Sequence, residues 1–190
     1  MNKTIFTSLF LLSALMIGCS SDTKKQTDKE TAKANAVMTT NQYILTSTDN
    51  KQFIVTKENG GFLLENAEGK VVIFDIFATW CPPCKASATH LTSLQEKFKD
   101  DLIIIGITIE DGISNDKLLQ FKKENNAAYS IVNSKDNRPL VNEIADALEL
   151  GDRFPIPIMA LYKDGKLLNH YVGEVQEEFV ASDIKVALGK

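Results

Sequence analysis

The sequence predicts an α/β domain with a central mixed sheet, preceded by a leader and a polar tether. Two apolar runs, residues 71–77 and 102–109, are nearly continuous, as expected of strands covered on both faces. Segments with helical spacing of apolar residues follow these runs, and the chain closes with an Asp-Gly hairpin signal and a last helix. This order of strands, helices and a final antiparallel hairpin is typical of a mixed sheet between helices.

Length and charge restrict the classes of function. A chain of 190 residues has room for one domain with a leader or linker. Its apolar fraction of 44% is ordinary for a globular protein. The formal net charge is −4, and no Lys/Arg cluster stands out, so we expect no nucleic-acid partner.

The first 18 residues have the pattern of an export signal. Lys3 supplies a positive start, and residues 5–18 are apolar with small side chains near their end. The run is too short for a membrane-spanning helix. The alternative to an export signal is a buried N-terminal helix. Residues 19–41 are mostly polar and lack aromatic side chains, so they cannot bury enough surface to order themselves. We predict a signal peptide over 1–18 and a disordered tether over 19–41.

The leader ends in Leu15-Met16-Ile17-Gly18-Cys19, which resembles the lipobox of bacterial lipoproteins. This resemblance implies cleavage before Cys19 and attachment of lipid to its thiol. Two or three acyl chains anchor a protein stably, whereas one is marginal. We therefore expect a lipid-anchored protein of the cell envelope that faces the periplasm. The choice between inner and outer membrane stays open.

From residue 42 onward the pattern is that of a folded domain. Strand-forming residues at 43–45 and 53–56 flank a turn at 48–51, which predicts an N-terminal β-hairpin. Further turns are predicted by Asn and Gly clusters. They are expected at 59–61 and 68–70, before the first central strand.

The remaining elements follow from apolar spacing and from signals for helix ends. Pro82 and Pro83 suit the first turn of a helix, because its N–H groups have no intrahelical partner there. Ser114 caps a later helix. The other expected elements are a helix at 115–125, a strand at 129–132, a helix at 139–150, strands at 158–162 and 167–171, and a helix at 177–188.

The segment Trp80-Cys81-Pro82-Pro83-Cys84 lies directly after the first central strand. A Cys-x-x-Cys pair that opens a helix after a buried strand is typical of reversible thiol–disulfide exchange. A closed zinc site is the rival, but it needs four ligands, and the two histidines, His90 and His170, lie away from the motif. A purely structural disulfide is the other alternative.

Residues 42–190 resemble the thioredoxin fold, and more narrowly the TlpA/ResA/CcmG group of membrane-tethered thioredoxin-like proteins. The strongest element is the run Phe77-Ala78-Thr79-Trp80-Cys81-Pro82-Pro83-Cys84-Lys85, close to the group's F-W-A-T-W-C-P-P-C-[KR] pattern. The expected helix at 115–125 and strand at 129–132 match the insertion of this group. A peroxiredoxin is excluded, because Phe74 and Ala78 occupy the Pro and Thr places of that family's P-x-x-x-[ST]-x-x-C motif.

The resemblance implies a cis-proline that faces the redox pair. Pro155 and Pro157 are the candidates, and residues 156–165 align without a gap to the family's I-P-T-L-L-L-F-K-N-G, which favours Pro157. Ile156 is then the residue whose backbone faces Cys81. Cys81, at the helix start, is expected to be the exposed nucleophile and Cys84 the buried resolving thiol.

Asp75 lies in the otherwise apolar strand before the motif, on the side of Phe77 by strand alternation. In thioredoxin an Asp at this place relays a proton to the second cysteine, so Asp75 is the candidate general base, with a raised pKa if buried. The alternative is an Asp that points to solvent at a strand end. Relatives more often have Asn here and a Glu at the position of Ser87.

The expected function is therefore an extracytoplasmic thiol:disulfide oxidoreductase, a reductase of disulfides in exported proteins. Apocytochrome c and copper-site proteins are the substrate candidates, and Trp80, Pro82, Pro83 and Ile156 are the expected substrate contacts. The resemblance implies a membrane electron donor of the DsbD/CcdA kind and no cofactor beyond the disulfide. The alternatives are a Cu(I)-handling protein that uses the cysteine pair, and a periplasmic dithiol oxidase or isomerase.

Overall fold

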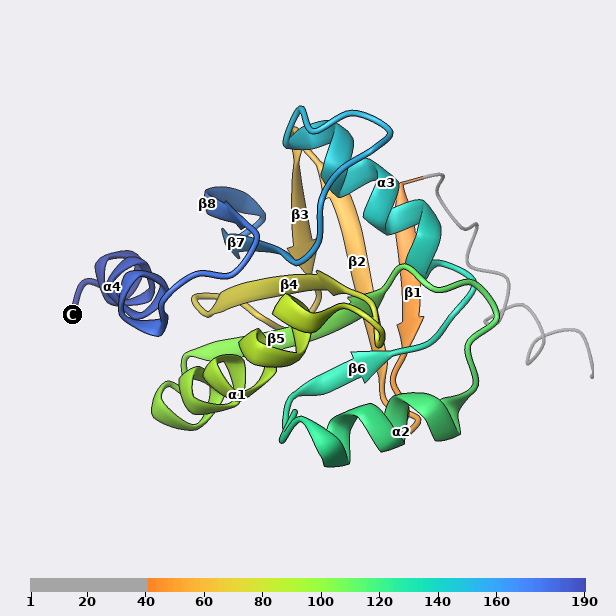
Figure 1. Cartoon of the computed structure of the whole chain (residues 1–190). Helices are drawn as coiled ribbons and strands as arrows, with labels where there is room; N and C mark the ends of the chain where they lie inside the picture. The colour runs from red at the N-terminus through yellow and green to blue at the C-terminus, as the bar shows by residue number, and fades with distance from the viewer. Residues whose placement is uncertain (1–40) are drawn as a thin grey trace, which may run out of the picture. The chain divides into compact units, whose positions relative to one another are not determined.

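The structure, a computed structural model, describes residues 41–190 (Figure 1). The predicted signal peptide, Cys19 and nearly all of the predicted tether lie outside the described residues. The described residues belong to one compact unit, Met38–Lys190, which has two apolar cores of its own. We therefore expect this unit to fold by itself. No helix within residues 41–190 has the length and apolar character needed to cross a membrane.

The first strands form a separate antiparallel sheet in the order β1-β2-β3. The predicted N-terminal hairpin is its β1–β2 pair. The third strand was not predicted from the sequence. A two-residue turn, Asn59 and Gly60, joins it to β2 with φ of 49° and 78°, the backbone of a type I′ hairpin. The strands are β1 (Gln42–Thr46), β2 (Gln52–Glu58) and β3 (Gly61–Leu64).

The main sheet is mixed, as the sequence predicts, with strand order β6-β5-β4-β7-β8. The neighbours β4, β5 and β6 are parallel, whereas β7 and β8 run antiparallel to β4 and to each other. The central strand β4 is buried along its whole length, because helices cover one face and β1–β3 with α3 cover the other. The strands are β4 (Val71–Phe77), β5 (Leu102–Thr108), β6 (Ser130–Val132), β7 (Ile158–Lys163) and β8 (Lys166–Val172).

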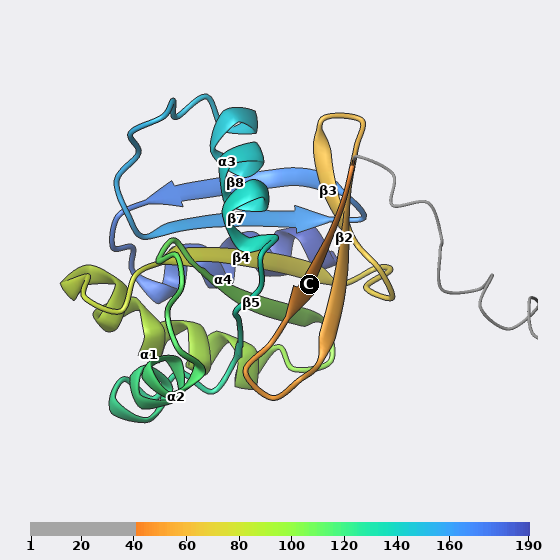
Figure 2. The same ribbon diagram turned by 90° about the vertical axis from the view of Figure 1, so that its right-hand side faces the viewer.

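Helices lie on both sides of this sheet (Figure 2). Its two faces carry separate apolar cores. The first core joins odd-numbered residues of β4 to α1, α4 and the inner side of α2. The second joins even-numbered residues of β4 to α3 and the small sheet. The predicted helix–strand insertion is present as α2 and β6. The helices are α1 (Pro82–Lys97), α2 (Asn115–Glu124), α3 (Asn137–Ala147) and α4 (Glu177–Leu188).

Helix α3 begins and ends earlier than the range 139–150 expected from the sequence. The buried Asn137 donates to the carbonyl oxygen of Val132 at 2.9 Å, which turns the chain into the helix before its proline. At the other end Glu149 has a φ of 56°, in the left-handed region that terminates helices. Local side-chain bonding and one left-handed residue therefore decide the helix ends.

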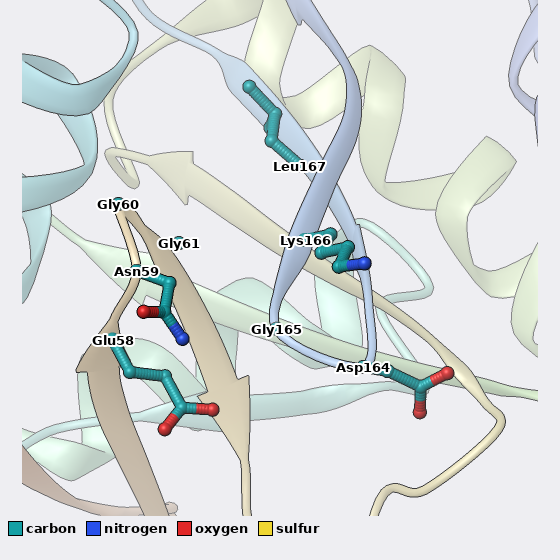
Figure 3. A pocket seen from close by; sticks show the side chains of 8 residues that line it. All are labelled: Glu58, Asn59, Gly60, Gly61, Asp164, Gly165, Lys166 and Leu167. Atoms are coloured by element: carbon teal, nitrogen blue, oxygen red, sulfur yellow. The ribbon is translucent and has the colours of Figure 1, made fainter.

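The small sheet and the main sheet meet where two hairpin turns approach each other (Figure 3). A Cβ added to Gly61 would lie 1.8 Å from the carbonyl oxygen of Gly165, so only glycine allows this approach. A shallow hollow of about 220 Å³ lies beside the contact, at the opposite end of β7 from Pro157. This contact fixes the small sheet to the β7–β8 hairpin.

Candidate functional site

The cysteine pair lies where β4 passes into α1. Cys81 is the N-cap of α1, and Pro82 and Pro83 occupy its first two positions, where no intrahelical acceptor exists for an N–H group. The Cys81 Sγ accepts a hydrogen bond from the Cys84 N–H at 3.3 Å. The sequence thus places a sulfur atom at the positive end of a helix.

Cys81 and Cys84 form a disulfide with a Cα–Cα distance of 5.3 Å, within the ordinary range. Cys84 is 2% exposed, as expected for the resolving thiol, but Cys81 is only 3% exposed. The expectation of an exposed nucleophile is therefore not met in this oxidised form. The physical reason is the neighbouring loop, whose Ile156 carbonyl oxygen lies 3.8 Å from the Cys81 Sγ.

That loop contains the one cis peptide bond of residues 41–190, between Ile156 and Pro157. It lies before β7, and the buried Pro157 accepts a hydrogen bond from the Gly173 N–H at 2.8 Å. The sequence alignment favoured this proline over Pro155, and the structure has the cis bond here. The Ile156 carbonyl oxygen thus faces Cys81.

Asp75 lies in the middle of β4 and is 2% exposed, which rules out the alternative of a solvent-facing Asp. Because residues two apart in a strand share a face, its side chain lies on the same face of the sheet as Ile73 and Phe77. Those two residues belong to the same core as both cysteines. The Oδ2 of Asp75 accepts a hydrogen bond from the Tyr129 hydroxyl at 3.1 Å. Its Oδ1 has no hydrogen-bond partner within the described chain. Burial raises the pKa of Asp75 to about 7, and the Tyr129 hydrogen bond opposes that rise.

Tyr129 is a residue of this site that the sequence reasoning missed. It precedes β6, is 2% exposed, and reaches Asp75 across β5. Gly106, which pairs with Asp75 in the parallel register, makes room for the ring: a Cβ there would lie 3.0 Å from the Tyr129 Cε2. A glycine inside an apolar strand indicates such a close approach, and this was the available signal.

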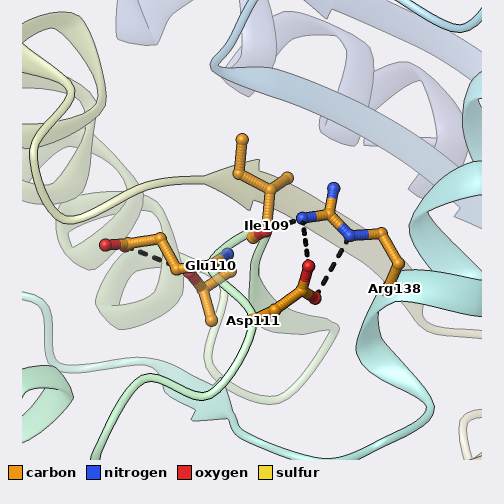
Figure 4. Close-up of polar contacts among 5 residues, drawn as sticks. Ile109, Glu110, Asp111 and Arg138 are labelled. Atoms are coloured by element: carbon orange, nitrogen blue, oxygen red, sulfur yellow. Dashed lines mark hydrogen bonds and ion pairs between the residues drawn. The ribbon is translucent and has the colours of Figure 1, made fainter.

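Glu110 is the second residue that was missed. Its Oε2 accepts the Thr79 N–H at 2.6 Å, and its Oε1 accepts the Thr79 hydroxyl at 3.0 Å. These bonds hold the loop immediately before Trp80 and Cys81. The Glu110 loop is itself fixed from α3, because Arg138 binds the Ile109 carbonyl and the Asp111 carboxylate (Figure 4). A chain of polar contacts therefore connects α3 to the active-site loop.

The other predicted contact residues surround the disulfide at different depths. Trp80 is 64% exposed and Pro82 is exposed, whereas Pro83 and Ile156 are partly buried. Ser87, at the place of the family's Glu, is buried, and its hydroxyl has no partner within residues 41–190. In the same range no group of three or more His, Cys, Asp or Glu side chains is placed to hold a metal ion.

Comparison with known proteins agrees with this geometry. The model of the AhpC/TSA family matches residues 46–148. The thiol-disulfide oxidoreductase ResA of Bacillus subtilis is 24% identical over 148 residues, which cover 77% of this chain and 78% of the relative. The chloroplastic thioredoxin F1 of Arabidopsis thaliana is 26% identical over 164 residues, covering 86% and 71%.

Solved structures share the fold. A thiol:disulfide interchange protein of the thioredoxin family from Chlorobium tepidum superposes with a TM-score of 0.63 at 20% identity, covering 78% of this chain and 94% of the other. StoA from Bacillus subtilis gives a TM-score of 0.53 at 16% identity, covering 75% and 95%. Both are similar to the described residues over the thioredoxin-like fold.

Phe74 and Ala78, which occupy the Pro and Thr positions of the peroxiredoxin motif, are apolar and fully buried here.

Proposed function

This chain belongs to the AhpC/TSA family and is a thiol–disulfide oxidoreductase of the thioredoxin fold, and we propose that it reduces disulfides of exported proteins outside the cytoplasm. The observation that carries the proposal is the Cys81–Cys84 disulfide at a helix start, opposite the cis Ile156–Pro157 bond. Asp75 is a buried acid on the sheet face whose residues Ile73 and Phe77 share a core with both cysteines. We propose no cofactor beyond this disulfide.

The first step is attack by the reduced Cys81. The helix N-terminus and the Cys84 N–H stabilise a thiolate at the Cys81 Sγ. This thiolate attacks one sulfur of a substrate disulfide and forms a mixed disulfide. The other substrate sulfur leaves as a thiolate and takes the electron pair of the broken bond. Because the Ile156 loop covers Cys81 in the oxidised form, we expect the substrate to contact that loop.

The second step is resolution by Cys84. Its thiol gives a proton to the Oδ1 of Asp75, and the resulting thiolate attacks the Cys81 Sγ. The bond between Cys81 and the substrate breaks, so the substrate leaves fully reduced and the Cys81–Cys84 disulfide forms. A carboxyl with a pKa of about 7 exchanges protons readily at neutral pH, which suits a general base.

Recognition and recycling complete the proposal. The exposed Trp80 and Pro82, with the Ile156 backbone, offer a surface for the segment around a substrate disulfide. A membrane donor of the DsbD/CcdA kind would return the electrons. Lipid at Cys19 would keep the enzyme in the cell envelope, beside exported substrates such as apocytochrome c or copper-site proteins. This placement rests on the lipobox resemblance and on the family relationship.

Trapping of mixed disulfides tests the proposal. In Cys84→Ala the resolving thiol is absent, so Cys81 should stay bound to its partners, visible as adducts on non-reducing gels and as Cys81-linked peptides by mass spectrometry. Cys81→Ala is the matched control and should trap nothing. Equal adducts in both variants, or none with Cys84→Ala, would contradict the assigned roles. Adducts confined to cytoplasmic proteins would contradict the extracytoplasmic role.

A further inference from the structure

We propose that Tyr129 is a positioning residue for the proton acceptor of this enzyme. In this proposal its hydroxyl holds the Oδ2 of Asp75, which leaves the Oδ1 to accept the proton of Cys84. The inference rests on the proposed function for its consequence on the reaction. Its structural part, a buried donor that sets the state of Asp75, is testable independently.

The two side chains are buried together and are bonded at 3.1 Å. Their contact needs the space above Gly106, where a Cβ would meet the Tyr129 ring at 3.0 Å, the Ile131 side chain at 3.2 Å and the Phe77 ring at 3.3 Å. Any larger residue in the middle of β5 would thus crowd the ring. The glycine in the middle of β5 therefore makes the Tyr129–Asp75 contact possible.

The segment that carries Tyr129 is fixed from two helices. The Thr92 hydroxyl of α1 donates to the Asn126 carbonyl at 2.6 Å and accepts the Ala128 N–H at 2.9 Å. From α2, the Lys122 ammonium donates to the Tyr129 carbonyl oxygen. These bonds place the tyrosine at the junction of α2 and β6. The helix–strand insertion thus supplies the donor for Asp75.

The surroundings of Asp75 leave Tyr129 as its hydrogen-bond donor. The strand neighbours are Gly106 on β5 and Met159 on β7, neither of which titrates. The inward residues of α4 are apolar, and α1 contributes Cys81, Cys84 and Ser87. Among the residues buried in this core, the titratable groups are therefore the cysteine pair and Tyr129. Tyr171 packs against the core from β8 and donates its hydroxyl to Asp183 of α4, and α1 also carries the partly buried His90.

The donated bond favours the charged carboxylate against the effect of burial. It lowers the pKa of Asp75, which burial alone raises. Without it Asp75 would hold its proton more tightly, and less of it would be ionised and ready to accept a proton at neutral pH. A hydrogen bond to a charged group is worth enough to change an ionisation constant about tenfold.

The direct test is titration of the Asp75 carboxyl carbon by NMR in the oxidised Met38–Lys190 unit. Tyr129→Phe should raise the measured pKa of Asp75 by about one unit, a tenfold change in its ionisation constant. Tyr162→Phe is the matched control: this tyrosine is also buried, but its hydroxyl has no partner within the described chain, and it lies in the other core. A Tyr129→Phe value equal to wild type, or an equal rise in Tyr162→Phe, would overturn the proposal.

A second variant covers the case in which Tyr129→Phe does not fold. Replacement of Tyr129 by 3-fluorotyrosine keeps the ring and makes the hydroxyl a stronger donor, so the pKa of Asp75 should fall. An unchanged value would overturn the proposal as well.

The kinetic test uses the pH dependence of mixed-disulfide resolution. In Tyr129→Phe the part of the pH–rate profile that depends on Asp75 should move to higher pH by the same amount as the measured pKa of Asp75. In an Asp75→Asn background, adding Tyr129→Phe should leave the pH–rate profile unchanged. A pH–rate profile shifted equally in both backgrounds would overturn the inference. Failure of Cys84→Ala to trap any mixed disulfide would refute the proposed function instead, while the carboxyl titration would still decide on Tyr129.

Discussion

Replacing Asp75 by Asn should change how stability depends on pH. The pKa of Asp75 rises from its ordinary 3.8 to about 7 in the folded protein, because the carboxyl is buried. Below pH 3.8 the carboxyl is protonated in both the folded and the unfolded chain, so burial costs no ionisation energy. Between the two values the unfolded chain ionises while the folded protein keeps its proton. The free energy of unfolding should therefore fall as pH rises through this window and level off above about 7.

The size of the effect follows from the two pKa values. They differ by about three pH units, which corresponds to about 4 kcal/mol of stability lost between acid and mildly alkaline pH. Asn cannot ionise, and its amide oxygen can still accept the Tyr129 hydrogen bond. The stability of Asp75→Asn relative to wild type should thus improve by up to about 4 kcal/mol between pH 3 and pH 8.

Urea unfolding of the oxidised Met38–Lys190 unit at pH 3, 5 and 8 measures this difference. Asp183→Asn is the matched control, because Asp183 also accepts a tyrosine hydroxyl, that of Tyr171 at 2.6 Å, but is only partly buried. Its stability relative to wild type should change much less over the same range. A difference between Asp75→Asn and wild type that stays within about 1 kcal/mol from pH 3 to pH 8 would refute the reasoning about Asp75.

Three further predictions concern other parts of the molecule. Glu110→Ala removes both acceptors of Thr79 and should cost about 1–3 kcal/mol in urea unfolding; an unchanged midpoint would mean that the loop before Cys81 does not need this support. Gly61→Ala should destabilise the fold by about 1–3 kcal/mol through its clash with Gly165, whereas Gly69→Ala, with open space but a φ of 74°, reports strain alone; equal costs would contradict the close approach. Cys19→Ala should move the protein from the membrane pellet to the soluble fraction of disrupted cells, and a variant that stays in the pellet would contradict lipid anchoring.

Much of the fold was predictable because buried elements produce recognisable patterns of apolar residues along the sequence. The central strand β4 was predicted with its observed ends. A short apolar run between a Gly turn and the cysteine motif is consistent with few structures other than a buried strand. The strand β3 was missed because four residues carry too little pattern, although the Asn-Gly pair before it is a strong hairpin signal. The start of α3 was missed because the Asn137 side chain, not the proline, determines it.

Some residues of the site could likewise be predicted from the sequence, and others could not. Cys81 and Cys84 are identified by their Cys-x-x-Cys spacing, and Pro157 by the match of residues 156–165 to the family's pattern. Both signals are local in the sequence. Tyr129 is not identified in this way, because its contact with Asp75 depends on two strand registers and on the space above Gly106. The burial of Cys81 also depends on a loop 75 residues away, which its own sequence neighbours do not indicate.

The reduction potential of the Cys81–Cys84 couple tests the central claim most directly. Equilibration of the Met38–Lys190 unit with defined thiol–disulfide buffers, followed by alkylation and mass spectrometry, gives this value. A reductase requires a disulfide form stable enough that the dithiol gives up its electrons, so we predict a potential near that of thioredoxin, about −270 mV. A potential near about −120 mV, that of a strong dithiol oxidase, would contradict the proposed direction of the reaction.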